Sequence, residues 1–261
     1  LITSRKIENK LLEIIDSHIE VKGYSLFVRQ VVPAVLVQST VLVFLHDALG
    51  SVGQWRDFPE MVAQQLNCRV IVYDRPLHGL SGGVHYGSIK EQFDSEKEIL
   101  HELLFELGVK MPGLIGVSDG ATISLNYAAS YPCDSVVAMA PHVIMEERIM
   151  VGIEGWMIKR TVYEEKLRSF HGDHTAPLID QWYRLWKKAD KEGWDMTPRL
   201  EDVKCPVFLI QDPGDPYGSS DQIDAIREKI PGAEIELIEK AGHFPYVNFP
   251  EKVIASIKSV L

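Results

Sequence analysis

The chain has 261 residues, of which 46% are hydrophobic and 25% are charged, a balance typical of an ordinary soluble globular domain. This composition excludes collagen, coiled-coil and disordered classes. The length suits one large domain, or one domain with an insertion, that buries about three quarters of its unfolded surface. The 27 basic and 37 acidic residues give a formal net charge of −10. Nucleic acids and anionic membranes are therefore disfavoured as partners, because both are bound mainly through Lys and Arg.

No apolar run reaches the roughly 18 to 20 residues that a membrane-spanning helix needs, and the first ten residues are charged rather than signal-like. We therefore expect no membrane partner and a cytoplasmic location. The expected location leaves aside any targeting segment before Leu1, since the sequence does not begin with Met. Nothing in the composition indicates an oligomeric state.

Short apolar runs rich in β-branched residues alternate with helical patterns along most of the chain. This alternation is typical of β-α-β units and predicts a mostly parallel sheet of the doubly wound α/β class, flanked by helices. An antiparallel hairpin is expected first, over 18–32. Strands are expected at 40–45, 69–73, 113–117, 135–140, 207–211 and 234–238. Helices are expected at 53–67, 90–107, 120–131, 220–229 and 251–260.

The alternation stops between 143 and 203, where helical patterns occur without a convincing strand. We therefore expect a core formed by 1–142 and 204–261, with 143–203 inserted as a helical lid or cap. This insertion holds Trp156, Trp182, Trp186 and Trp194. Trp182 and Trp186 are four residues apart and share one face of a helix. Two interpretations stay open and can hold together: the aromatic stripe packs the insertion onto the core, or it lines an apolar substrate pocket.

The three cysteines, Cys68, Cys133 and Cys205, contain no C-x-x-C pair and predict neither a disulfide framework nor a thiolate zinc site. We expect all three to be buried, reduced packing residues. The nine histidines contain no H-x-x-x-H or H-E-x-x-H pattern, so no metal ion is expected either.

The sharpest local motif is a G-x-S-x-G pentapeptide, Gly116-Val117-Ser118-Asp119-Gly120. The bare pattern arises by chance in roughly one chain in ten of this length, so its weight comes from its position between an expected strand and an expected helix. In such a turn the glycines let strand and helix approach closely, and the serine oxygen is pushed outward. The start of the helix then favours negative charge that develops nearby.

A serine nucleophile needs a histidine base and an acid that orients the histidine. Asp212-Pro213-Gly214-Asp215 follows the expected strand 207–211, and Ala241-Gly242-His243 follows the expected strand 234–238. Both segments are predicted at the carboxyl edge of the sheet, where functional loops gather in open α/β folds. Ser118, an aspartate near 215 and His243 therefore occur in the chain order Ser, Asp, His.

Over nearly its whole length the chain resembles the α/β-hydrolase fold family. Residues 44–51, FLHDALGS, resemble the family's H-G-x-x-G-S oxyanion loop, and residues 73–81, YDRPLHGLS, resemble its D-x-x-G-x-G-x-S loop. Residues 242–245, GHFP, with Pro250-Glu251 after them, resemble its G-H-x-P…P-E histidine loop.

The resemblance implies that Ser118 is the nucleophile and that His243 is the general base and acid. It implies Asp215 as the orienting carboxylate, with Asp212 as the runner-up because Asp212 stands where the family's G-x-x-D pattern has glycine. It further implies that the oxyanion is bound by two backbone N–H groups. These belong to Ala48 and Asp119. No organic cofactor is implied.

One departure from the pattern affects the oxyanion loop. Asp47 stands where glycine is common, and a carboxylate there is unfavourable unless it is paired or points away. Five further residues are expected to have structural rather than catalytic roles. His46 and His78 are expected to bond loop backbones, His171 and His174 to lie in a surface loop, and Trp55 to pack near the oxyanion loop. Whether His142 faces the pocket stays open.

The function that the resemblance implies is a serine hydrolase. It would cleave a carboxylic ester, thioester or lactone of a small to medium apolar substrate through an acyl-enzyme. A carbon–carbon bond hydrolase of the meta-cleavage-product type and a non-catalytic small-molecule receptor remain as alternatives. Haloalkane dehalogenases and epoxide hydrolases are disfavoured because they carry Asp where this chain has Ser118. The fold hosts too many reactions for the substrate itself to follow.

Overall fold

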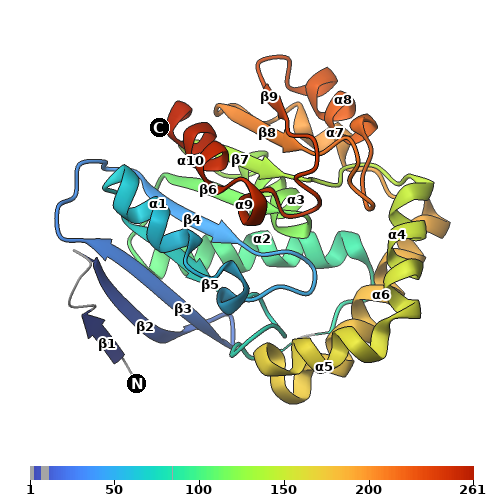
Figure 1. Cartoon of the computed structure of the whole chain (residues 1–261), viewed down its shortest axis with the longest axis horizontal. Helices are drawn as coiled ribbons and strands as arrows, with labels where there is room; N and C mark the ends of the chain where they lie inside the picture. The colour runs from blue at the N-terminus through green and yellow to red at the C-terminus, as the bar shows by residue number, and fades with distance from the viewer. Residues whose placement is uncertain (1–2, 7–11, 84) are drawn as a thin grey trace.

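The computed structural model describes residues 3–6, 12–83 and 85–261. In this part of the chain, nine strands form one sheet in the order β1-β2-β3-β5-β4-β6-β7-β8-β9 (Figure 1). The strands are β1 (Thr3–Lys6), β2 (Leu12–Val21), β3 (Tyr24–Pro33), β4 (Val41–Leu45), β5 (Val70–Tyr73), β6 (Pro112–Val117), β7 (Ser135–Met139), β8 (Val207–Gln211) and β9 (Glu234–Leu237). All six strands expected from apolar runs occur, each within one residue at either end. The expected hairpin is longer than predicted, and β1 was not predicted.

The direction of the strands divides the sheet into two parts. β1, β2 and β3 pair antiparallel, and β3 pairs antiparallel with β5. All pairings from β5 through β4, β6, β7 and β8 to β9 are parallel. After β4 the chain moves to one side to form β5 and then crosses to the other side to form β6. The carboxyl ends of β4 and β6 therefore flank a switch point, the place where open α/β sheets bind ligands.

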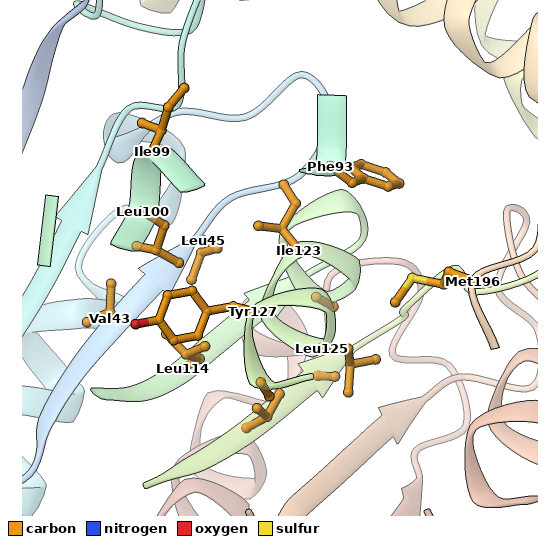
Figure 2. Close-up of a cluster of buried hydrophobic side chains, with 14 of the residues drawn as sticks. Val43, Leu45, Phe93, Ile99, Leu100, Leu114, Ile123, Leu125, Tyr127 and Met196 are labelled. Carbon is orange, nitrogen blue, oxygen red and sulfur yellow. The ribbon is translucent and has the colours of Figure 1, made fainter. Parts of the chain in front are cut away.

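Helices cover both faces of the sheet. One face carries α1 (Phe58–Leu66), α9 (Pro245–Asn248) and α10 (Pro250–Ser259), and the other carries α2 (Ile89–Glu106), α3 (Asp119–Ala128) and α8 (Ser220–Lys229). Successive side chains of β4 point to opposite faces of the sheet, so this strand packs against both helical layers. Leu42 and Phe44 pack toward α1 and α10, whereas Val43 and Leu45 pack toward α2 and α3. Figure 2 shows Val43 and Leu45 in this second layer.

The prediction of one continuous helix over 53–67 was wrong. The segment 53–67 forms a short 3-10 helix, η1 (Val52–Trp55), and then α1. Arg56 separates them with a φ of 57°, which no α-helix accommodates. Pro59 is the second residue of α1, where its missing N–H leaves no helical hydrogen bond unmade.

Helices occupy the chain between β7 and β8. They are α4 (Glu147–Ile158), α5 (Arg160–His171), the 3-10 helix η2 (Gly172–His174), α6 (Thr175–Glu192) and α7 (Thr197–Leu200). Figure 1 shows α4, α5 and α6, coloured yellow to orange, together beside one end of the sheet. On α6, Trp182 and Trp186 are buried, while the charged side chains of the segment 187–192 are exposed. The helix therefore presents its aromatic face inward, as its spacing predicts.

Two of the three cysteines are buried as expected, namely Cys68 and Cys133. Full burial was wrong for Cys205, which is half-buried because it follows an exposed turn at the end of α7. Among the helices formed by residues 3–6, 12–83 and 85–261, none combines the length and apolarity that crossing a bilayer requires.

Candidate active site

Ser118 stands alone between β6 and α3 in a strained conformation, with φ of 55° and ψ of −125°. Non-glycine residues rarely adopt such angles, and strain of this kind concentrates at functional sites. The turn is tight because of its two glycines. A Cβ atom at Gly116 would overlap the backbone of Gly120 and Ala121, and a Cβ atom at Gly120 would overlap the carbonyl of Leu45. The elbow expected from the G-x-S-x-G pattern is therefore present in the backbone.

His243 and Asp215 come from loops after neighbouring strands and meet at the carboxyl edge of the sheet. The Nδ1 atom of His243 lies 2.8 Å from Oδ2 of Asp215. The other carboxylate oxygen of Asp215 accepts a 2.8 Å hydrogen bond from the Tyr217 amide. Burial acts to raise the pKa of Asp215, but the adjacent His243 and these hydrogen bonds outweigh burial and lower it. An ionised Asp215 suits the orientation of a histidine through Nδ1.

Asp212, the alternative acid, makes different contacts. Its Oδ1 accepts a 2.8 Å hydrogen bond from the Gly214 amide, and its Oδ2 accepts a 2.6 Å bond from the Gly242 amide. Asp212 thus joins the turn that carries Asp215 to the loop that carries His243. Of the two aspartates, Asp215 is the one that contacts the imidazole.

Ser118 and His243 line one cavity of about 390 Å³. No hydrogen bond joins their side chains among the described residues, so the structure brings the two to the same space without linking them. Ala48 and Asp119, the expected oxyanion donors, line this cavity too. Asp119 is the first residue of α3, where amide N–H groups lack intrahelical acceptors. Both residues therefore line the same cavity as Ser118.

Another part of the cavity lining comes from the helices between β7 and β8. The aromatic side chains that they contribute are Trp156, Tyr163, Phe170, Trp182 and Trp186. Trp194 is not among the lining residues and packs edge-on against Phe93 and Trp186. Part of the aromatic stripe therefore lines the cavity, and part of it packs the segment against the core.

A buried arginine holds the peptide unit that joins Asp47 to Ala48. The carbonyl oxygen of Asp47 accepts a 2.7 Å hydrogen bond from Nη2 of Arg75 and a 2.9 Å bond from Nδ1 of His46. Arg75 is itself held by a 2.6 Å ion pair with Glu96, and both side chains are fully buried. The N–H group of this same peptide is that of Ala48. The two hydrogen bonds to the carbonyl oxygen therefore fix the direction of the Ala48 N–H group on the same peptide. The sequence analysis missed this role of Arg75, although Arg75 lies in the loop 73–81.

Histidines reinforce the same loop. His78 bonds the carbonyl oxygens of Pro76 and Ala48, so the structural interpretation of His46 and His78 is confirmed. The expectation for His171 was wrong, because its side chain is only 2% exposed. His171 accepts a 2.8 Å bond from the Gly79 amide and lies 3.0 Å from the Leu49 carbonyl oxygen. It therefore ties the end of α5 to two core loops, a contact that only the folded chain creates.

His142 lines the cavity, which answers the open question about its position. Its Nε2 lies 3.2 Å from the carbonyl oxygen of Tyr217, and its ring centroid lies 5.8 Å from that of His243. Burial and the neighbouring His243 lower the pKa of His142 to about 4, so it is neutral near pH 7. Tyr217, whose ring centroid lies 4.7 Å from that of His243, also lines the cavity and was missed by sequence analysis. Its proximity to Asp215 in the chain was the available signal.

Two acidic residues line the cavity together with Ser118. Asp47 lines the cavity, and its carboxyl group is paired within its own loop, where it accepts a 3.3 Å hydrogen bond from the Leu49 amide. Burial raises its pKa. Asp119 is 2% exposed, and burial raises its pKa to about 7 against the opposing effect of Arg75. Its Oδ1 has no hydrogen-bond partner within the described part of the chain. Burial thus favours the neutral acids, which limits the electrostatic conflict with an oxyanion.

We expect Asp119→Asn to stabilise the protein relative to wild type as pH rises. An acid whose pKa is raised by folding binds more protons in the folded state, so stability is lost from about pH 4, its unfolded pKa, to about pH 7, its folded pKa. Between pH 4 and pH 8 the variant should gain about 3 to 4 kcal/mol in unfolding free energy over wild type. Urea unfolding across this range measures the difference. Asp224→Asn on the exposed face of α8 is the control, and a parallel pH dependence of Asp119→Asn and wild type would contradict the expectation.

Residues 3–6, 12–83 and 85–261 contain no group of three or more His, Cys, Asp or Glu side chains that could hold a metal ion. The reactive groups that line the cavity include those of a serine, two histidines and two acidic residues.

Comparison with known proteins agrees with this geometry. The family model described as "Alpha/beta hydrolase family" matches residues 42–256, which is most of the chain. The chain belongs to the alpha/beta hydrolase family. As a member of this family it is a hydrolase enzyme with the family's mostly parallel sheet and flanking helices.

Two proteins named as hydrolases are similar to this alpha/beta hydrolase in sequence. The sn-1-specific diacylglycerol lipase ABHD11 of Danio rerio is 25% identical over 254 residues, covering 85% of this chain and 78% of its own. The serine hydrolase BPHL of Mus musculus is 23% identical over 222 residues, covering 81% of this chain and 75% of its own. Among solved structures, a bacterial membrane phospholipase A matches with a TM-score of 0.75 and 16% identity, covering 95% of this chain and 85% of its own. The match to the phospholipase A structure shows a shared fold and nothing about activity.

Proposed function

We propose that this alpha/beta hydrolase is a serine hydrolase that cleaves a carboxylic ester, thioester or lactone through an acyl-enzyme on Ser118. The observation that carries the proposal is the position of Ser118. The residue is held at a positive φ between a strand and a helix, on the cavity that His243 also lines. The 2.8 Å contact between His243 and Asp215 supports the roles of base and orienting acid for these two residues.

In the proposed reaction, Ser118 Oγ attacks the substrate carbonyl carbon while Nε2 of His243 takes the hydroxyl proton. The negative charge on the carbonyl oxygen is met by the N–H groups of Ala48 and Asp119. Collapse of the tetrahedral intermediate breaks the bond to the leaving group, which receives the proton from His243. Water, deprotonated by His243, then releases the acid and restores Ser118. Asp215 stays ionised and keeps the imidazole in one orientation.

The cavity supports the proposed substrate class. A volume of about 390 Å³ lies at the small end of ligand pockets, and its aromatic wall suits an apolar acyl or leaving group. Small to medium apolar substrates are therefore favoured. The relatives named as a diacylglycerol lipase and a serine hydrolase are compatible with ester cleavage.

We further propose that the segment 143–203 is a lid inserted in the core formed by 1–142 and 204–261. Its helices contribute aromatic residues to the cavity that Ser118 lines, and His171 at the end of α5 bonds Gly79 and Leu49 in two core loops. A substrate of the proposed class would thus be enclosed between lid and core.

The test is turnover of p-nitrophenyl esters of increasing acyl length by wild type and by His243→Ala, with matched folding by circular dichroism. We expect wild type to turn over repeatedly, with a preference for short to medium acyl chains, and His243→Ala to lose several orders of magnitude in kcat/KM. Wild type that is no faster than the variant on any ester would overturn the proposal. Hydrolysis of a vinylogous diketone without ester turnover would instead favour carbon–carbon bond cleavage.

A further inference from the structure

Cys133 and Cys205 are 72 positions apart in the sequence, yet their sulfur atoms lie 3.4 Å apart. Cys133 precedes β7, Cys205 precedes β8, and these strands are parallel neighbours in the sheet. The Val136 amide donates a 3.0 Å hydrogen bond to the carbonyl oxygen of Pro206, which holds the two strand starts together. The thiol pair therefore lies at the amino edge of the sheet, opposite the edge that carries the cavity.

The two thiols differ in chemistry. The Cys133 thiol donates its hydrogen to the sulfur of Cys205. This hydrogen bond lowers the pKa of Cys205, and it raises the pKa of Cys133, which burial raises further. Cys205 is also half-buried, whereas Cys133 is only 6% exposed. The accessible member of the pair is thus the better nucleophile, the usual arrangement of an attacking and a resolving cysteine.

Cys68 provides a contrast within the same chain. It is fully buried in the layer beneath α1, and burial raises the pKa of its thiol to about 12. A thiol in such surroundings is inert to oxidants that require a thiolate.

We propose that Cys133 and Cys205 form a redox-sensitive site that closes to an intrachain disulfide under a mild oxidant of the peroxide class. In the first step the Cys205 thiolate attacks hydrogen peroxide, forming an S–O bond as the O–O bond breaks, and hydroxide leaves. In the second step the Cys133 sulfur attacks the Cys205 sulfenic acid, the S–S bond forms, and the Cys133 proton leaves with the hydroxyl as water. Two sulfur atoms are oxidised, one peroxide is reduced, and a dithiol reductant reverses the change.

The covalent ring closed by this disulfide contains β7, His142 and the whole of 143–203. A disulfide has an S–S length of about 2.05 Å, so the sulfur atoms approach by about 1.4 Å from their present contact. A cross-link over so long a loop restricts the unfolded chain strongly. The oxidised protein should therefore hold both ends of the helical segment together when heated.

The experiment treats the full-length reduced protein with a small excess of hydrogen peroxide, blocks free thiols with N-ethylmaleimide, and maps peptides without reduction. We expect one cross-linked pair that joins the Cys133 and Cys205 peptides, a loss of two hydrogen atoms from the intact protein, and reversal by dithiothreitol. The midpoint of thermal unfolding should rise by about 5 to 10 °C on oxidation. The hydrolase rate should change by less than about twofold, because the pair and the cavity lie at opposite sheet edges.

Cys68→Ser is the matched control and should cross-link like wild type. Cys133→Ser should leave Cys205 as a sulfenic acid or an overoxidised thiol, with no rise in the thermal midpoint. Cys205→Ser should likewise form no cross-link and show no rise in the thermal midpoint. Oxidation of Cys205 in wild type with Cys133 left as a free thiol would overturn the proposal. A cross-link that leaves the thermal midpoint unchanged would overturn its structural consequence.

Discussion

Replacing Ser118 with alanine is expected to lower kcat/KM for a p-nitrophenyl ester by about four to six orders of magnitude. The loss is large because the proposed acyl-enzyme has no other acceptor at the strained turn between β6 and α3. Stability should change little, since the Ser118 side chain makes no hydrogen bond with the described residues and alanine keeps a Cβ. Steady-state kinetics with circular dichroism and thermal unfolding measure the two effects separately.

A fluorophosphonate probe gives an independent readout of the same residue. Wild type should incorporate one probe per chain on the Ser118 peptide, and Ser118→Ala should incorporate none. Ser124→Ala is the matched control, because Ser124 lies on α3, the helix that follows Ser118, and its hydroxyl bonds only the Gly120 carbonyl. Labelling of a different residue, or activity of Ser118→Ala within about tenfold of wild type, would refute the assignment of the nucleophile.

Asp215→Asn is expected to lower kcat by about 10⁴, with a much smaller change in KM. The amide has the size of the carboxylate but lacks its charge, so it neither holds His243 in the required tautomer nor stabilises the imidazolium. In the structure Asp215 contacts His243 Nδ1 at 2.8 Å, so the effect should appear directly in the chemical step.

Asp212→Asn is the matched comparison at the neighbouring carboxylate. It keeps one acceptor oxygen for the loop amides of Gly214 and Gly242 and leaves the imidazole contact unchanged. We expect a loss of no more than about 10- to 100-fold, typical of a residue that positions a catalytic group. Equal losses for both variants, or a larger loss for Asp212→Asn, would contradict the geometry.

Strands β4 to β8 could be predicted closely because each is a short apolar run bounded by turn residues. β8, at Val207–Gln211, agrees with its prediction at both ends. Such runs are buried on both faces of a parallel sheet, so local composition alone indicates them. The helix expected at 53–67 failed because its break depends on the positive φ of Arg56, and no apolar periodicity reports a single backbone angle.

The part of the candidate site that could be predicted is the part whose reactive residue and backbone turn lie in one short segment. The elbow at Ser118 is of this kind, because both glycines that allow it lie within two residues. The choice between Asp212 and Asp215 was not predictable from residue types, since both are aspartates in one turn. Their roles differ because the loop that carries His243 brings the His243 imidazole to Asp215 and the Gly242 amide to Asp212.

The sequence by itself determined the alternation of strands and helices, the order of the serine, aspartate and histidine, and the aromatic face of α6. These features depend on spacing and on interactions within a few residues. Only the tertiary structure decided that His171 is buried against the loop that contains Leu49, that Arg75 holds the peptide of Ala48, and that Cys133 meets Cys205. Each of these contacts joins residues 28 to 122 positions apart, and the packing of the sheet with its helices determines which distant residues become neighbours.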